Sequence, residues 1–126
     1  MAKIMIVDDS EPIRSLFMAL IDMLFPDCEV LPASNGEESV TLARATGPDV
    51  IFMDINMPVM DGITATKQIK SFLPSARIVM LTGFDDIKLR RDAESAGACD
   101  YLLKQSMHKE LKPLLKRLLK NEDLAI

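Results

Sequence analysis

The sequence predicts an α/β fold in which five parallel strands alternate with five helices. Short apolar runs such as residues 3–7, 49–53 and 76–81 alternate with segments whose apolar side chains recur at helical spacing. Turn and cap residues separate the two kinds of segment. The chain has 126 residues, the usual length of one domain, so we expect a single sheet covered by helices on both faces.

Each element has a local justification. The predicted strands are residues 3–7, 28–31, 49–53, 77–81 and 99–103. The predicted helices are residues 11–24, 37–45, 62–71 and 86–96, and a last one around residues 111–119. Pro12 suits a first helical turn, and Gly47-Pro48 ends the second helix and starts the third strand. Asp61 is expected to cap the third helix, and Gly97 to close the fourth.

The last helix carries two signals that conflict. Its leucines recur at helical spacing, at positions 111, 114, 115, 118 and 119. We interpret them as an ordinary core stripe; the alternative is that some are exposed for a partner or a second copy. Pro113 falls inside this pattern, and an interior proline costs about 3 kcal/mol or more. We therefore expect the helix to begin late, with Lys112 near its cap, or to kink at Pro113.

Right-handed crossovers between parallel strands leave few strand orders to consider. The flavodoxin-like doubly wound (βα)5 order, 2-1-3-4-5, places the third strand between the first and the fourth. In that order the carboxyl ends of all five strands lie on one edge of the sheet, where open α/β sheets bind ligands.

Polar side chains gather at this predicted edge. Asp8 and Asp9 end the first strand, Asp54 the third, Thr82 the fourth and Lys104 the fifth. Neighbouring strands lie about 4.8 Å apart, so the fifth strand is about 10 Å from the third and needs a long side chain to reach it. Any one of these residues alone would be a solvated charge or a turn cap. Their shared position favours one acidic site.

The chemistry of this residue set points to phosphoryl transfer. Three converging carboxylates repel one another and raise one another's pKa unless a cation joins them. Hard oxygen ligands with open positions suit Mg²⁺, and its charge together with one lysine would balance the three carboxylates. An aspartate can act as a nucleophile that forms an aspartyl phosphate. The glycine-rich motifs of other phosphate-binding folds do not follow the first strand.

Composition excludes several other classes of function. A net charge of −4 and a pI near 4.9 argue against direct nucleic-acid binding. The sequence has neither an 18-residue apolar stretch nor a secretory signal, so we expect no membrane association and a cytoplasmic location. Cys28 and Cys99 lack CxxC spacing, and we interpret both as reduced, with no zinc cluster.

At this point the chain resembles the receiver domain of two-component response regulators, of the kind found in chemotaxis proteins. The resemblance covers essentially the whole chain, residues 1–126, as a single domain. Its most specific motifs are Val7-Asp8-Asp9-Ser10, Asp54 followed by Met57-Pro58 and Met60-Asp61-Gly62, Leu81-Thr82-Gly83, and Gly97-Ala98 leading to Tyr101-Leu102-Leu103-Lys104.

The resemblance implies a role for each acidic residue. Asp54 would accept a phosphoryl group from a histidine kinase or a phosphotransfer protein. Asp9 would bind Mg²⁺ directly, Asp8 would bind it through water, and the backbone carbonyl of Asn56 would complete the protein ligands together with Asp54. The domain would then be a signalling switch that catalyses its own phosphorylation and dephosphorylation, and not an enzyme acting on other substrates.

The resemblance also implies how the switch operates. Thr82 would close on the phosphoryl group, Tyr101 would rotate inward with it, and Lys104 would bind the phosphate. The surface that changes would be the fourth helix, the fifth strand and the last helix, which would bind an output partner or form a homodimer. The family usually has proline after the lysine, in a cis peptide, where this chain has Gln105. A cis bond without proline costs about 2.5–4 kcal/mol, so the sequence leaves two alternatives: a cis peptide as in the family, or a trans peptide that would aim Lys104 differently.

Two other function classes stay open. An aspartyl-phosphate phosphatase should carry a D-x-D pair after its first strand, a spacing that Asp8-Asp9-Ser10 lacks. A docking module that works without phosphorylation should not respond to Mg²⁺ and a phosphodonor. The sequence stops just past the last helix, at Leu124-Ala125-Ile126, which fits a stand-alone protein or the front part of a larger regulator.

Overall fold

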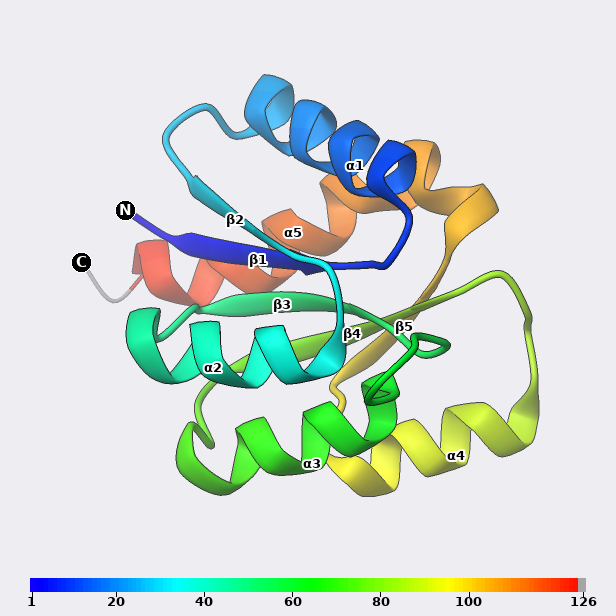
Figure 1. The fold of residues 1–126 in the computed structure, drawn as a ribbon. Helices are drawn as coiled ribbons and strands as arrows, with labels where there is room; N and C mark the ends of the chain where they lie inside the picture. The colour runs from blue at the N-terminus through cyan, green and yellow to red at the C-terminus, as the bar shows by residue number, and fades with distance from the viewer. Residues whose placement is uncertain (125–126) are drawn as a thin grey trace.

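The computed structural model describes the backbone of residues 1–124 and the side chains of residues 1–119. Its five strands are β1 (Lys3–Val7), β2 (Glu29–Ala33), β3 (Val50–Asp54), β4 (Arg77–Thr82) and β5 (Asp100–Leu103). They pair in parallel in the order β2-β1-β3-β4-β5 (Figure 1). The predicted flavodoxin-like order is confirmed.

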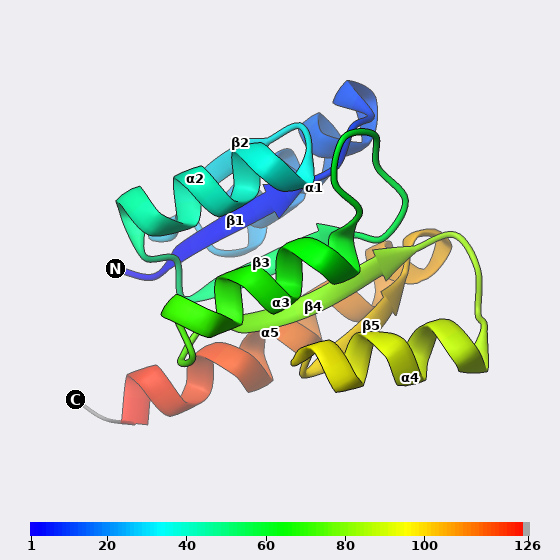
Figure 2. The same cartoon turned by 60° about the horizontal axis from the view of Figure 1, so that its bottom comes forward.

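Five α-helices cover the two faces of this sheet. They are α1 (Glu11–Leu24), α2 (Gly36–Thr46), α3 (Gly62–Phe72), α4 (Ile87–Ala96) and α5 (Met107–Leu124), the last preceded by a 3-10 turn at Lys104–Ser106. Figures 1 and 2 show α1 and α5 on one face and α2, α3 and α4 on the other. None of these helices, within the part of the chain that the structure describes, combines the length and the apolarity needed to cross a membrane.

The core is divided into two layers by the sheet. On the α1/α5 side, the rings of Phe17 and Phe52 lie 5.5 Å apart and both are fully buried. On the α2/α3/α4 side, the strands contribute the buried methionines Met5, Met53 and Met80. Strands buried on both faces read as continuous apolar runs, which is why the strand positions could be predicted from hydrophobicity alone.

The helix ends follow the expected capping chemistry. Asp61 accepts a hydrogen bond from the Thr64 backbone N–H at 2.8 Å and caps α3, as predicted. Gly97 closes α4 with a φ of 113°, a left-handed conformation that glycine adopts without steric cost. Asp86 lies one residue before α4 as its N-cap.

Strand β2 extends two residues beyond its predicted end. The next residue, Pro32, cannot donate a hydrogen bond to a neighbouring strand. In the structure, Pro32 lies within β2, paired in register with Ile6 of β1. Since β2 is an edge strand, the missing donor leaves no neighbour without a partner.

The prediction that the last helix, α5, begins late is wrong. The helix begins at Met107 and continues through Pro113, so Lys112 is not at its cap. Pro113 is exposed, while the adjacent Leu111, Leu114 and Leu115 are buried against the sheet, so packing of the leucine stripe outweighs one lost backbone hydrogen bond. The core interpretation of the leucines is confirmed for these three and for Leu119. A kink at Pro113 stays a prediction.

The N-terminus of α3 is pressed against the end of β3. A methyl group on Gly62 would lie 2.0 Å from the backbone carbonyl oxygen of Asp54. The Gly62 N–H donates to the Ile55 carbonyl oxygen at 2.8 Å, which joins the helix start to the residue after Asp54. Only glycine permits this close approach of two backbones.

We therefore predict that Gly62→Ala destabilises the protein by about 1–3 kcal/mol, although alanine is the better helix former. Urea unfolding of the purified variant would measure the change. Gly83→Ala is the matched control, because a methyl group there would meet nothing within 4 Å. Equal stability of the two variants would contradict the close contact.

Candidate functional site

The register of the sheet brings the polar strand ends together. Val7 is paired with Met53, so Asp8 and Asp54 follow in the same row on neighbouring strands. Asp54 is itself paired with Leu81, which places Thr82 one residue further along β4. The predicted edge therefore carries the predicted residues side by side.

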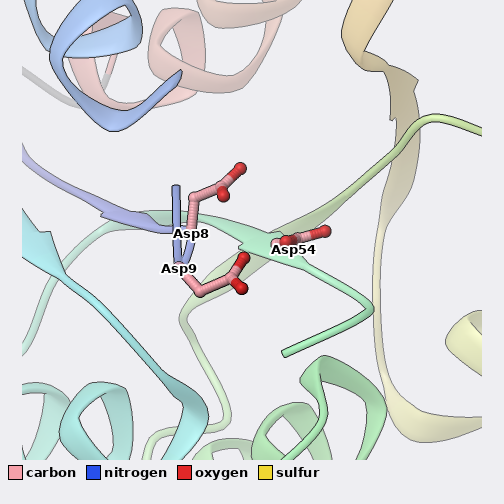
Figure 3. Close-up of side chains that lie close together, drawn as sticks. All are labelled: Asp8, Asp9 and Asp54. Carbon is pink, nitrogen blue, oxygen red and sulfur yellow. The ribbon is translucent and has the colours of Figure 1, made fainter. Parts of the chain in front are cut away.

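The three carboxylates form one cluster. Asp8, Asp9 and Asp54 each offer an oxygen within 4.8 Å of the others. Figure 3 shows Asp54 at the end of β3 and Asp8 and Asp9 just beyond the end of β1, with all three carboxylates pointing to the same side. Asp8 is fully buried and Asp54 is 4% exposed, whereas Asp9 is exposed. The cluster thus has two buried members and one that faces solvent.

Lys104 is the cation of this cluster. Its ammonium nitrogen lies 2.8 Å from Asp8 Oδ2 and 3.4 Å from Asp54 Oδ2, so it reaches past Asp54 to the far carboxylate. The described residues contain no cis peptide bond, so the Lys104-Gln105 peptide is trans. With this trans peptide, Lys104 still contacts Asp8 and Asp54. The chain enters a 3-10 turn at Lys104, and this turn directs the side chain toward the carboxylates without proline.

The electrostatics of the cluster are unbalanced. Burial, reinforced by the negative charge of Asp8, raises the pKa of Asp54 to about 6 despite the opposing effect of Lys104. Burial alone would lower the pKa of Lys104, but its hydrogen bond to Asp8 and the charges of Asp54 and Asp8 outweigh burial and raise it. Lys104 is therefore charged at neutral pH, and one ammonium faces three carboxylates.

These residues fit a divalent cation. Asp8 Oδ1 accepts a hydrogen bond from the Ser10 N–H at 2.9 Å. Asp8 Oδ2 is buried, and its partner among the described residues is the Lys104 ammonium at 2.8 Å. Oxygen ligands with spare capacity and excess negative charge are what Mg²⁺ requires.

The loop between β3 and α3 holds Asn56 and a strained residue. Asn56 is exposed, and its backbone carbonyl as a metal ligand stays a prediction. Val59 has a φ of 70° within a tight turn in which the Met60 N–H donates to the Pro58 carbonyl oxygen at 2.8 Å. A β-branched residue in this conformation costs on the order of 1–3 kcal/mol and persists only where its surroundings enforce it. Gly36 supplies one such constraint, since a methyl group there would lie 2.5 Å from the Met60 carbonyl oxygen.

Thr82 and Tyr101 are linked through a residue that sequence reasoning missed. Thr82, which is 1% exposed, accepts a hydrogen bond from the Phe84 N–H at 3.1 Å. The Tyr101 hydroxyl donates to the Phe84 carbonyl oxygen at 2.8 Å. Arg90 lies 4.5 Å above the Tyr101 ring and pairs with Asp85 at 2.9 Å. Both Phe84 contacts use the backbone, so its side-chain type carried no signal in the sequence.

The raised pKa of Asp54 makes stability depend on pH. Below about pH 4 the carboxyl is neutral in both the folded and the unfolded chain, so it has no effect. Between about pH 4 and 6 only the unfolded chain is ionised, and above about pH 6 the folded protein bears the full cost of the buried charge. A shift from 3.8 to about 6 corresponds to about 3 kcal/mol.

We therefore predict that Asp54→Asn stabilises the metal-free protein at pH 7 by up to about 3 kcal/mol, and that this gain disappears near pH 4. Lys104 keeps its partner Asp8 in this variant. Urea unfolding across this pH range, in a chelating buffer, measures the effect. Asp92→Asn, at an exposed position of α4 outside the cluster, is the control and should not reproduce this gain. A gain that grows toward low pH would contradict the assignment.

Comparison with known proteins identifies the family to which this geometry belongs. The sequence model of the response regulator receiver domain matches residues 4–116. LiaR, a transcriptional regulatory protein of Bacillus subtilis, is 43% identical over 124 residues, which cover 97% of this chain and 58% of LiaR. The chemotaxis protein CheY of Halobacterium salinarum is 39% identical over 105 residues, which cover 82% of this chain and 86% of that protein.

Solved structures of receiver-containing proteins have the same fold as this chain. A LuxR-family two-component response regulator from Aurantimonas sp. SI85-9A1 superimposes with a TM-score of 0.88 at 33% identity, covering 95% of this chain and 86% of the other. The chemotaxis protein CheY4 of Vibrio cholerae gives a TM-score of 0.79 at 30% identity, covering 90% and 98%.

The chain spans about half the length of several regulators that it matches, 47% for LnrK and 58% for LiaR. In some relatives the matching region is a smaller part still, such as 26% of a protein-glutamate methylesterase of Photobacterium profundum. The match is therefore to the domain that these proteins share. With the family model covering residues 4–116 and the carboxylate cluster in its expected place, this chain belongs to the response regulator receiver domain family.

Proposed function

We propose that this chain is a phosphorylation-activated signalling switch in which Asp54 accepts a phosphoryl group from a histidine kinase or a histidine phosphotransfer protein. The observation that carries the proposal is the placement of the Asp54 carboxylate, which lies beside the buried Asp8 and 3.4 Å from the ammonium group of Lys104. A carboxylate in this environment is positioned as a nucleophile and is flanked by groups that can neutralise an added phosphate.

The transfer itself is an exchange of one bond for another. A carboxylate oxygen of Asp54 forms a bond to phosphorus as the phosphorus–nitrogen bond of the donor histidine breaks. In the metal-free protein the pKa of Asp54 is about 6, so its carboxylate is mostly ionised at pH 7 and available as the nucleophile. Lys104 lies close enough to donate to a phosphoryl oxygen on Asp54.

We propose that Asp8, Asp9 and Asp54 hold Mg²⁺ together with the backbone carbonyl of Asn56. Bound there, the ion would neutralise the charge that the three carboxylates and the phosphoryl oxygens share. Asp9 faces solvent and can bind the ion directly, whereas Asp8 is already engaged by Ser10 and Lys104 and suits a water-mediated contact. The domain itself would catalyse its phosphorylation and dephosphorylation.

The output is proposed to pass through Thr82 and Tyr101 to the surface of α4, β5 and α5. If Thr82 moves to bind a phosphoryl oxygen, the hydrogen bond from Phe84 is lost or displaced, and so is the acceptor of the Tyr101 hydroxyl. Phe84 and Ile87 are about two-thirds exposed on this side, at 67% and 70%. An output partner or a second copy of the chain would bind to the changed surface.

We further propose that residues 1–126 act as one domain, in the cytoplasm and without direct nucleic-acid binding.

We predict that Mg²⁺ and a small acyl phosphate add one phosphoryl group of about 80 Da to the protein. Intact-mass measurement should detect this addition in the wild type and not in Asp54→Asn. Circular dichroism should show that the variant is folded. Phosphorylation that survives in Asp54→Asn would overturn the assignment of the acceptor.

For the switch, we predict that beryllofluoride with Mg²⁺ shifts the amide resonances of residues 82–104 and of α5. Thr82→Ala should shrink these remote shifts and still allow phosphorylation of Asp54, since the hydroxyl is not the nucleophile. Thr46→Ala, which removes a hydroxyl bonded to the Leu42 carbonyl on α2, is the control and should leave the shifts intact. Shifts confined to residues that contact the ligand would refute this route.

A further inference from the structure

Arg14 on α1 is bonded directly to the backbone of the acidic cluster. Its Nη1 donates a hydrogen bond of 2.7 Å to the backbone carbonyl oxygen of Asp8, and the side chain is half-buried. Neither the acceptor role of Asp54 nor the proposed switch requires this contact. Arg14 is nevertheless the residue of α1 that joins the helix to the loop carrying Asp8 and Asp9.

The position of Arg14 is unfavourable for the helix itself. It is the fourth residue of α1, and its own N–H donates to the Ser10 carbonyl oxygen at 2.9 Å as the helix begins. Cations near a helix N-terminus oppose the helix dipole. Helical stability therefore does not account for an arginine here, and a local rule broken beside a functional site points to a role in that site.

The bond acts on the peptide that joins two cluster residues. The Asp8 carbonyl oxygen belongs to the Asp8-Asp9 peptide unit, which is planar, so anchoring the oxygen restricts rotation of the whole unit. The Asp8 N–H is held by the Ala33 carbonyl oxygen at 3.1 Å, and its side chain by the Ser10 N–H. Asp9, in contrast, is exposed. The Arg14 bond thus restricts rotation of the peptide unit from which Asp9 extends.

We propose that Arg14 is a positioning residue for the cation site: it orients the Asp8-Asp9 peptide so that the Asp9 carboxylate faces Asp54 and can bind the divalent ion. This inference rests on the proposed function, because it takes Asp8, Asp9 and Asp54 as the ligand set.

An electrostatic role and a positioning role predict opposite effects of removing Arg14 on cation binding. If Arg14 acted only as a nearby positive charge, its removal would strengthen the binding of a cation to the cluster. If it orients Asp9, its removal would weaken binding, and outer-shell partners of metal ligands typically affect affinity by tenfold or more. The sign of the change therefore separates the two roles.

The test is the affinity for Mg²⁺ alone, measured by following amide resonances during titration at a temperature where every variant is folded. We expect Arg14→Met to bind Mg²⁺ roughly tenfold more weakly than the wild type. Arg14→Lys, which keeps one donor and the charge, should recover most of the loss. Arg44→Met is the matched control, since Arg44 lies on α2 with its guanidinium 4.1 Å from the Phe72 ring and carries the same charge. Its affinity should equal that of the wild type.

Equal or tighter binding by Arg14→Met would overturn the inference and leave the metal site standing. A loss of the same size in Arg44→Met would also overturn it, because the effect would then not be local. A wild-type protein that binds no Mg²⁺ would overturn both this inference and the proposed metal site. Arg14→Lys binding as weakly as Arg14→Met would show that the donor at this position does not set the affinity, and would also contradict the inference.

Discussion

The repulsion among three carboxylates at one sheet edge is the constraint on which the rest of this structure depends. Asp8 and Asp54 are buried side by side, and a single ammonium group, that of Lys104, contacts both. Burial, together with the negative charge of Asp8, raises the pKa of Asp54, and one ammonium does not balance the three carboxylates. The fold tolerates this cost because the strands on either side are packed in a continuous apolar core.

The two sides of the site differ in how firmly they are held. On the β3 side, the close approaches at Gly36 and Gly62 and the strained turn at Val59 leave the backbone little freedom. On the β4 side, the loop after Thr82 is held by the hydrogen bonds of the Phe84 backbone with Thr82 and Tyr101 and by the exposed ion pair of Asp85 with Arg90. A rigid acceptor beside a loosely held loop is the arrangement that a switch requires, since one element must stay in place while another has two positions.

Much of the fold could be predicted because its signals are local. Strands buried on both faces are apolar throughout, and helices begin and end at Asp61, Gly97 and similar residues whose chemistry does not depend on the rest of the chain. Strand β2 and helix α5 differ from their predicted bounds next to prolines. Pro32 lies in an edge strand and Pro113 on the exposed face of α5, and in both cases tertiary context removed a cost that local rules assign.

The sequence by itself determined which residues end the strands, and parallel pairing then placed Asp8, Asp9, Asp54, Thr82 and Lys104 on one edge. Only the tertiary structure decided how these side chains meet. The trans peptide before Gln105 still directs Lys104 to Asp8, and the Phe84 backbone joins Thr82 to Tyr101. Such contacts depend on loop conformation and on backbone groups that every residue carries, so they could not be predicted from a pattern of side-chain types.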